Sequence, residues 1–358
     1  MISPLKDGYT LPFEGLNHDG TIILLPYRSD TWELNGSIAF KEFEKIILTI
    51  AKYEHVYVIK SKNVKYDISS ILNKENISIH EIEYDDSWAR DNTLIFLRNK
   101  NGDLKAVDFG FNAWGGNVDG LYSSWKNDNL LGENLTKLLN VDCYKDKDFL
   151  LEGGSIHSNG KGILLTTEAC LLSEGRNKNL TKEEIENHLK EMLGMEKIIW
   201  LPHGIYNDET NEHVDNMACF LDEKTVLLAT TKDESDIQYK WSMEAKNILE
   251  SNGLNVLLIN CPNPYLKLTK EEANSIILDD GAKLRIEGDR LAASYVNFYM
   301  GKDFIILPKF NVKEDLEAYN LLNDFYKGTK KIHQIESRNI LVSGGNIHCI
   351  TMQIGKGE

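Results

Sequence analysis

Five residues with chemically active side chains stand at or near the starts of short apolar runs: Asp91, Glu152, His213, Asp215 and Cys349. Cys349 follows the glycine pair Gly344-Gly345 close to the end of the chain. A thiolate is a strong nucleophile, and a nucleophilic cysteine usually works with a histidine that transfers protons. Taken alone, Cys349 is better explained as an ordinary buried thiol, because unpaired cysteines are among the most buried residues.

His348 directly precedes Cys349, but the local pattern argues against a catalytic pair. The run Gly345–Met352 is predicted to be a β-strand, because Ile347, Ile350 and Thr351 favour extended structure. Successive side chains of a strand point to opposite faces, so the thiol and this imidazole would diverge. The acid/base partner of Cys349 is therefore expected elsewhere in the chain.

The other four residues each have a structural explanation as well. Asp91 could pair with the adjacent Arg90, and Glu152, before Gly153-Gly154, could cap a turn. His213 could be a surface histidine among acidic residues, although on a strand it would share a face with Asp215. Singly, these structural explanations are favoured; together, the residues indicate a site only if the fold brings them to one place.

A repeated hairpin pattern predicts that convergence. Two apolar runs separated by a polar turn occur four times: Asn92–Leu97 with Leu104–Phe109, Gly154–His157 with Gly162–Thr167, Asp215–Leu221 with Thr225–Thr230, and Ser294–Met300 with Asp303–Pro308. The run Gly345–Met352 has no second strand after it, and Gly20–Pro26 has no first strand before it. We expect these two to pair and close a ring of five hairpins without exposed edges.

Amphipathic helices and further strands separate the hairpins. The expected helices are Phe40–Tyr53, Leu130–Leu139, Thr181–Leu193, Ser235–Ser251 and Val312–Tyr326, and the further strands are His55–Lys60, Lys197–Leu201, Asn255–Leu258 and Ile332–Ile335. Thr181 and Glu184 form a capping-box pattern at a helix start. The repeating unit of hairpin, helix and strand predicts an α/β fold with one domain over residues 1–358, in which equivalent hairpin starts converge on a central axis.

Composition narrows the class of partner. The chain has 358 residues and a formal net charge of −15, which disfavours binding to nucleic acid or to an anionic membrane and fits a small cationic substrate. Its five cysteines include no Cys-x-x-Cys pair and no metal-ligand spacing. With no signal-peptide pattern and no long apolar run, a reduced, cytoplasmic setting is expected.

Ordered stretches along almost the whole chain resemble the agmatine deiminase family. They are Gly8–Pro12, Asp85-Asp-Ser-Trp-Ala-Arg-Asp91, Phe111-Asn-Ala-Trp-Gly-Gly116, Leu151-Glu-Gly-Gly-Ser-Ile-His157, Thr166–Leu172, Asp208–Thr210, His213-Val-Asp-Asn216, Arg290–Tyr299 and Gly344-Gly-Asn-Ile-His-Cys-Ile-Thr351. This family belongs to the guanidino-group-modifying (pentein) superfamily, so the resemblance implies a five-bladed, pseudo-symmetric α/β-propeller.

The resemblance also implies a mechanism. Cys349 would attack the guanidinium carbon and form a covalent amidino-thioether, while His213 would protonate the departing ammonia and then deprotonate water. Asp91 and Asp215 would hold the guanidinium nitrogens, and Glu152 would pair with the substrate and His213.

Substrate contacts are further expected from Trp88, Trp114 and Gly345. The implied reaction converts agmatine and water into N-carbamoylputrescine and ammonia, and none of its steps requires a metal or another cofactor. The alternatives are deimination of another guanidino compound, of the arginine or peptidyl-arginine type, and a non-catalytic guanidine- or polyamine-binding protein. The sequence does not decide the oligomeric state, and a homodimer or homotetramer is compatible with it.

Three departures from the family pattern concern the site. Asn92-Thr93-Leu94 replaces Thr-Gly-Pro, Glu212 replaces a glycine, and Ile22-Ile23-Leu24 replaces tryptophans. Glu212 is expected either to raise the pKa of His213 or to move its loop. The clustered carboxylates are expected to raise the pKa of the Cys349 thiol, so that a bound guanidinium must help its deprotonation.

Overall fold

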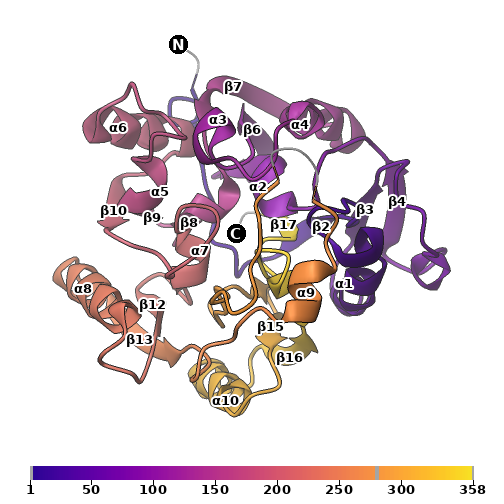
Figure 1. Ribbon diagram of the computed structural model, residues 1–358. Coiled ribbons are helices and arrows are strands. Elements are labelled where there is room, and N and C mark those ends of the chain that lie inside the picture. The colour runs from indigo at the N-terminus through magenta and orange to yellow at the C-terminus, as the bar shows by residue number, and fades with distance from the viewer. Residues whose placement is uncertain (1–2, 279–281, 357–358) are drawn as a thin grey trace.

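The structure, a computed structural model, describes residues 3–278 and 282–356 and has a mixed α/β fold. The strands are β1 (Tyr9–Thr10), β2 (His18–Leu24), β3 (Val56–Lys60), β4 (Ile77–Glu81), β5 (Ile95–Asn99), β6 (Leu104–Gly110), β7 (Asp142–Leu150), β8 (Ile156–Ser158), β9 (Ile163–Thr167), β10 (Lys197–Leu201), β11 (Ala218–Phe220), β12 (Thr225–Thr230), β13 (Asn255–Asn260), β14 (Tyr299–Met300), β15 (Phe304–Lys309), β16 (Lys331–Glu336) and β17 (Thr351–Gly355). The longer helices are α1 (Ser37–Ile50), α4 (Lys126–Leu139), α6 (Lys182–Leu193), α8 (Ile237–Ser251) and α10 (Glu314–Tyr326). Helices α6, α8 and α10 lie at the outer edge of the molecule, whereas strand β4 lies further out than α1 (Figure 1).

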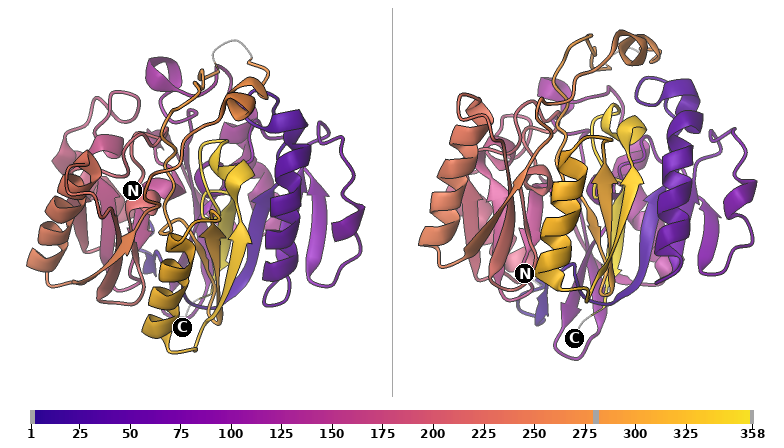
Figure 2. Two further views of the ribbon diagram at one scale, coloured as in Figure 1. Left: turned by 60° about the horizontal axis from the view of Figure 1, so that its bottom comes forward. Right: turned by 90° about the horizontal axis from the view of Figure 1, so that it is seen from below.

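The described strands form five sheets, ordered β1-β5-β6-β7, β10-β9-β8, β11-β12-β13, β14-β15-β16 and β17-β2-β3-β4. Four of them contain a predicted hairpin, since β5–β6, β8–β9, β11–β12 and β14–β15 are antiparallel pairs. In the third unit α8 follows the hairpin and leads to β13, which runs parallel to β12. The predicted order of hairpin, helix and further strand is confirmed, and the parallel pairing of that strand is seen only in the structure. Figure 2 shows helices packed outside such sheets.

The two ends of the chain meet in one sheet. Strand β17 pairs antiparallel with β2, with Thr351 opposite Ile23, as the unpaired runs predict. The three apolar residues that replace the family's tryptophans, Ile22, Ile23 and Leu24, are fully buried in β2. They therefore contribute to the apolar core, and none of them lines the cavity described below.

The C-terminal strand begins later than predicted. Residues 347–350 form a turn, in which Ile350 N–H donates to Asn346 O at 3.3 Å, and Thr351 N–H donates to His348 O at 3.1 Å. The predicted alternation of His348 and Cys349 across a strand is therefore wrong. The backbone folds here because Gly344, at φ 115°, takes a conformation that other residues rarely adopt.

Short helical turns also replace the starts of the predicted hairpins. They are α2 (Ala89–Asn92), the 3₁₀ turn η3 (Gly153–Ser155) and α7 (Val214–Met217). His213 is the N-cap of α7, and Asp215 lies in its first turn, so the expected shared strand face is wrong. A polar residue beside a helical turn interrupts strand pairing and leaves its side chain free to face the interior.

The five predicted helices are confirmed, with boundaries that differ by a few residues. Thr181 caps α6, and both hydrogen bonds of its capping box with Glu184 are formed. Strands β4 and β7 were not expected, because their alternation of half-buried and exposed residues is weak. In the described part of the chain, no helix is both long and apolar enough to span a membrane.

Candidate active site

The fold brings the five expected residues together, and all of them are at least nine-tenths buried: Asp91, Glu152, His213, Asp215 and Cys349. Gly154 marks where three of them meet. A Cβ atom on this glycine would lie 2.6 Å from His213 Nδ1, 2.8 Å from Asp91 Oδ1 and 3.0 Å from Asp215 Oδ2. Only glycine leaves room for these groups, so the Gly153-Gly154 pair has a steric role in the site.

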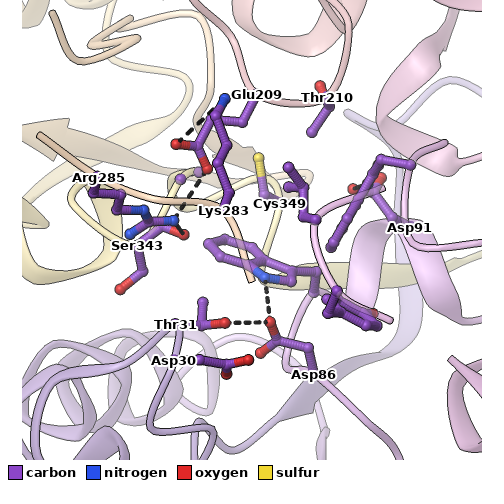
Figure 3. Close-up of a pocket in the computed structure, with 16 residues that line it drawn as sticks. Asp30, Thr31, Asp86, Asp91, Glu209, Thr210, Lys283, Arg285, Ser343 and Cys349 are labelled. Carbon is purple, nitrogen blue, oxygen red and sulfur yellow. Dashed lines mark hydrogen bonds and ion pairs between the residues drawn. The ribbon is translucent and has the colours of Figure 1, made fainter. Parts of the chain in front are cut away.

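A cavity of about 480 Å³, including the solvent space at its mouth, reaches the thiol. Its wall includes Asp91 and Cys349 and the three expected contact residues Trp88, Trp114 and Gly345. Figure 3 shows Cys349 between Asp91 on one side and Glu209 and Arg285 on the other. Glu152, His213 and Asp215 do not line this cavity.

The sulfur of Cys349 has two polar neighbours. Asn297 Nδ2 lies 3.1 Å away, and Asp215 Oδ2 lies 3.5 Å away. Burial, followed by the negative charges of Asp215 and Asp91, raises the pKa of the thiol well above its ordinary value. The expected effect of the carboxylates on the cysteine is thus present in the structure.

Asp91 faces the cavity with both oxygens hydrogen-bonded. Trp114 Nε1–H donates to Oδ2 and Gly154 N–H donates to Oδ1, both at 2.9 Å. Burial, with Asp215 and Glu152 adding to it, raises the pKa of Asp91 to about 6. The suggested ion pair with Arg90 is wrong, because that guanidinium turns to Glu14 at 3.1 Å.

His213 lies between two carboxylates. Its Nδ1 is 3.9 Å from Asp91 Oδ2, and its Nε2 is 3.9 Å from Glu152 Oε2. Burial disfavours the imidazolium, but Asp91, Cys170 and Glu152 outweigh it and raise the pKa of His213 well above its ordinary value. A protonated imidazole at this position can act as a general acid.

Glu152 keeps its negative charge through Arg176. The two side chains are fully buried and form an ion pair at 2.8 Å. Burial favours the neutral acid, yet Arg176 and His213 hold the pKa of Glu152 below its ordinary value. Arg176 also donates to Thr210 O at 3.0 Å and to Asn211 Oδ1 at 2.8 Å, which ties Glu152 to the loop before His213.

Three buried polar atoms of the site have no hydrogen-bond partner among the described residues: Asp215 Oδ1, Glu152 Oε2 and His213 Nε2. Buried polar atoms in native proteins are nearly always hydrogen-bonded, so exceptions need a reason. Two of these atoms are carboxylate oxygens, which accept N–H groups from a cation. A guanidinium bound beside Cys349 would supply the missing donors.

Two tryptophans shape the cavity. Trp88 donates its Nε1–H to Asp86 Oδ2 at 3.1 Å and stacks on Trp32 with ring centres 4.9 Å apart. Trp114 has φ 64°, a left-handed conformation that is strained for a bulky residue. In this conformation the indole N–H of Trp114 donates to Asp91. Both tryptophan rings are therefore held by contacts within the protein itself.

Gly345 lies between the ring of Trp88 and the thiol of Cys349. A Cβ atom at this position would lie 2.5 Å from the Trp88 ring and 3.1 Å from the sulfur of Cys349. Any side chain would push against both groups. The expectation that Gly345 belongs to the binding site is consistent with this geometry.

The carboxylate of Glu212 points away from His213. Its Oε2 accepts from Gly204 N–H at 2.9 Å and lies 3.0 Å from His203 Nδ1. Glu212 has φ 66°, the left-handed region that favours glycine, which explains why glycine suits this position in the family. Its charge therefore anchors the loop through His203. Asn92, the first residue of the departure Asn92-Thr93-Leu94, donates to Asp128 Oδ1 at 2.9 Å and does not line the cavity.

Three residues of this region were not predicted to take part: Asn297, Arg176 and Glu209. Asn297 lies within the apolar run Ser294–Met300, and a polar side chain that is fully buried in such a run is a detectable signal. Arg176 and Glu209 lie in polar loops, where nothing in the sequence separates them from surface residues.

Two buried groups could bring ligand atoms close enough for a metal ion, namely Glu14 with His157 and His348, and Glu152 with Cys170 and His213. Each carboxylate already has a cationic partner, Arg90 for Glu14 and Arg176 for Glu152. An arginine thus occupies the place beside each carboxylate that a metal ion would take, so neither group is assigned a metal.

Comparison with known proteins agrees with this geometry. The model of the Porphyromonas-type peptidyl-arginine deiminase family matches residues 10–355. The chain belongs to this family. A protein of Listeria monocytogenes serotype 4b, provisionally named agmatine deiminase 1, is 43% identical over 361 residues, which cover 99% of this chain and 98% of the relative.

Solved structures of the family extend the comparison. Agmatine deiminase of Enterococcus faecalis is 34% identical, with a TM-score of 0.92 over 99% of this chain and 98% of the other. A substrate-bound agmatine deiminase of C. jejuni is 28% identical, with a TM-score of 0.84 over 98% and 97% of the two chains. The mixed α/β fold is thus that of known agmatine deiminases.

Proposed function

We propose that this protein hydrolyses agmatine to N-carbamoylputrescine and ammonia through a covalent amidino-cysteine intermediate. The observation that carries the proposal is the unpartnered, buried oxygen Oδ1 of Asp215, whose other oxygen lies 3.5 Å from the thiol of Cys349. A planar cation with several N–H donors satisfies this oxygen and presents its central carbon to the sulfur.

Each step follows from a named group. The guanidinium binds Asp91 and Asp215, and the Cys349 thiolate attacks its carbon to give a tetrahedral adduct. His213 donates a proton to the departing nitrogen, so that ammonia leaves and an amidino-thioether remains. The neutral His213 then takes a proton from water, and the hydroxide attacks the same carbon. The C–S bond breaks to return the thiolate, and the hydroxyl proton of the adduct passes to solvent as the neutral carbamoyl product leaves.

The bound cation also activates the nucleophile. In the empty site, Asp215 and Asp91 raise the pKa of Cys349, which keeps the sulfur protonated. A guanidinium between these carboxylates offsets their charge and favours the thiolate. The thiol is then deprotonated mainly when substrate is present.

Glu209 is positioned for the far end of agmatine. It lines the same cavity as Cys349, and its carboxylate lies 3.0 Å from Arg285 and 3.9 Å from Lys283 (Figure 3). We propose that the carboxylate of Glu209 binds the distal ammonium group of agmatine. Glu209→Gln should raise KM for agmatine and leave KM for butylguanidine, which lacks the amine, unchanged; equal effects would contradict the assignment.

Lys283 and Arg285 support a second candidate function. Two cations at one cavity suit a substrate that carries a carboxylate beside its guanidinium, such as free arginine or a C-terminal arginine of a peptide. Lys283→Ala should lower activity on such a substrate but not on agmatine.

Ammonia release from agmatine, arginine and a C-terminal-arginine peptide separates these functions. We expect the highest kcat/KM for agmatine and no activity in Cys349→Ala. Higher activity on either arginine substrate would favour the second function. Activity on no guanidino compound would favour a binding protein.

For the architecture, we propose that the five sheets act as blades of a propeller forming one domain over residues 1–358, with the β17–β2 pair closing the ring. The repeated hairpin, helix and strand in successive sheets support this arrangement. We also propose a cytoplasmic location, supported by five cysteines that are all unpaired.

A further inference from the structure

A line of ionisable groups leads from the thiol of Cys349 through Asp215 and His348 to Glu14, and the last three do not line the cavity beside the thiol. Asp215 Oδ2 lies 3.5 Å from Cys349 Sγ and 2.9 Å from His348 Nδ1. The other ring nitrogen, His348 Nε2, lies 3.0 Å from both oxygens of Glu14. His348 therefore joins two carboxylates, and only one of them belongs to the guanidinium site.

The hydrogen bonds decide the charge of this histidine. An ionised carboxylate can only accept, so both ring nitrogens must donate, and the ring is an imidazolium. Burial and Arg90 disfavour that charge, but Glu14 and Asp215 outweigh them and raise the pKa of His348. In return His348 helps to hold the pKa of Asp215 below its ordinary value, although burial opposes it.

Glu14 is held firmly in place. Arg90 Nη1 lies 3.1 Å from its carboxylate, and His157 Nε2 lies 3.5 Å from it. Phe220 N–H donates to His157 Nδ1 at 3.2 Å, so Nε2 carries the proton of that ring and also faces Glu14 as a donor. Burial by itself would raise the pKa of Glu14, but the positive charges of His348, Arg90 and His157 outweigh it and hold that pKa well below its ordinary value.

The contacts of Asp215 divide its two oxygens. His348 and the thiol face Oδ2, whereas Oδ1 is buried with no partner in the described chain. The charged and titratable groups that act on Asp215 or His348 are Glu14, Arg90, Asp91, Asp208, His213, Cys219 and Cys349. None of these seven makes a hydrogen bond shorter than 3 Å to Asp215, whereas His348 does.

We propose that His348, held by Glu14, is a positioning residue for deimination: it fixes Asp215 as an ionised carboxylate with Oδ1 free for the guanidinium. The proposal rests on the function proposed above. His348 touches neither the cavity nor the reacting atoms, and it acts through Asp215. The backbone N–H of His348 also donates to Asn297 Oδ1 at 3.0 Å, so His348 also orients the Asn297 amide that faces the sulfur of Cys349.

Nuclear magnetic resonance of protein with ¹⁵N-labelled histidine tests the charge without any substrate. We expect the imidazoles of His348 and His213 each to have both nitrogens protonated at pH 7.5, and the signals that vanish in His348→Gln to identify the ring of His348. In Asp215→Asn and in Glu14→Gln the ring should lose its second proton at lower pH. A neutral His348 ring in the wild type at pH 7.5 would overturn the proposal.

Kinetics then test the positioning role. In His348→Gln and Glu14→Gln we expect KM for agmatine to rise at least tenfold, with a smaller fall in kcat, because guanidinium binding is weakened before and during reaction. The acid limb of kcat/KM should move to higher pH and steepen, since Asp215 and Asp91 then take up protons in the same range. The control is His80→Gln, whose imidazole contacts Ser78 outside the cavity.

The outcomes remain distinguishable. Unchanged KM and an unchanged acid limb in both variants would overturn the positioning role. If His348→Gln does not fold, the positioning role is decided by two other measurements. These are the kinetics of Glu14→Gln, which removes one charge at similar volume, and the spectrum of the wild type. If the wild type releases no ammonia from agmatine, the proposed function fails, whereas the imidazolium is still measured by the resonance experiment.

Discussion

The side-chain amide of Asn297 lies against the sulfur of Cys349, with Nδ2 3.1 Å from Sγ. Its orientation is fixed, because Oδ1 accepts from His348 N–H at 3.0 Å and so leaves the N–H groups facing the sulfur. Burial, Asp215 and Asp91 raise the pKa of the thiol, while hydrogen bonds from the backbone of Asn346 and from the side chain of Asn297 lower it. Asn297 is thus a neutral side-chain donor that favours the thiolate among carboxylates.

Asn297→Ala should therefore make Cys349 harder to deprotonate. A hydrogen bond to a charged group contributes about 1.5 kcal/mol or more, which corresponds to a rise of about one pKa unit. The rate of inactivation by iodoacetamide against pH measures this shift. Asn311→Ala, at an exposed position, is the control, and an unchanged profile in Asn297→Ala would contradict the assigned role.

Activation of the thiol by a bound cation predicts a difference between two alkylating reagents. Iodoacetamide is neutral, whereas 2-chloroacetamidine brings an amidinium that Asp91 and Asp215 can hold. Inactivation by the cationic reagent should show a lower apparent pKa for Cys349, because its charge offsets that of the carboxylates. Equal values for both reagents would refute substrate-assisted activation.

The raised pKa of Asp91, about 6, predicts the acid limb of activity. As pH falls through this value the carboxylate becomes neutral and loses its hold on the guanidinium, so kcat/KM for agmatine should fall below about pH 6. Trp114→Phe keeps a ring but removes the N–H that stabilises the charged form, so the limb should move to higher pH. A limb at the same pH in this variant would show that another group sets it.

The buried pair of Arg176 and Glu152 predicts a loss of stability. Arg176→Met leaves an uncompensated carboxylate in the interior and should lower the free energy of unfolding by about 3–5 kcal/mol. The double variant Arg176→Met/Glu152→Gln removes both charges and should recover part of that loss. Urea denaturation measures both variants, and a double variant less stable than Arg176→Met would contradict the explanation.

The pairing of β17 with β2 predicts the effect of a truncation. Removing residues 351–358 exposes the edge of β2 and the apolar side chains that β17 covers. The truncated protein should be unfolded or aggregated by circular dichroism and size-exclusion chromatography. A control lacking only residues 357–358 should behave as the full chain, and a folded, stable truncation would contradict the role of β17.

Much of the architecture could be predicted from local patterns. Apolar runs on either side of polar turns predicted four hairpins, and the antiparallel strand pairs of the structure confirm them. The capping box of Thr181 and Glu184 marked the start of α6. The short helical turns that hold Asp91 and Asp215 escaped this approach, because four residues are too few to show helical periodicity. Asp91 and Asp215 are therefore placed in the site by short helical turns and not by the expected strands.

The sequence by itself determined which residues could react and in what order their hairpins follow, because polar residues before apolar runs are visible in the chain. Only the tertiary structure decided the ion pairs. Arg90 pairs with Glu14 instead of its neighbour Asp91, and His348 meets Glu14 across 334 positions of the chain. Electrostatic energy depends on distance and burial in space, and neither can be obtained from separation along the sequence.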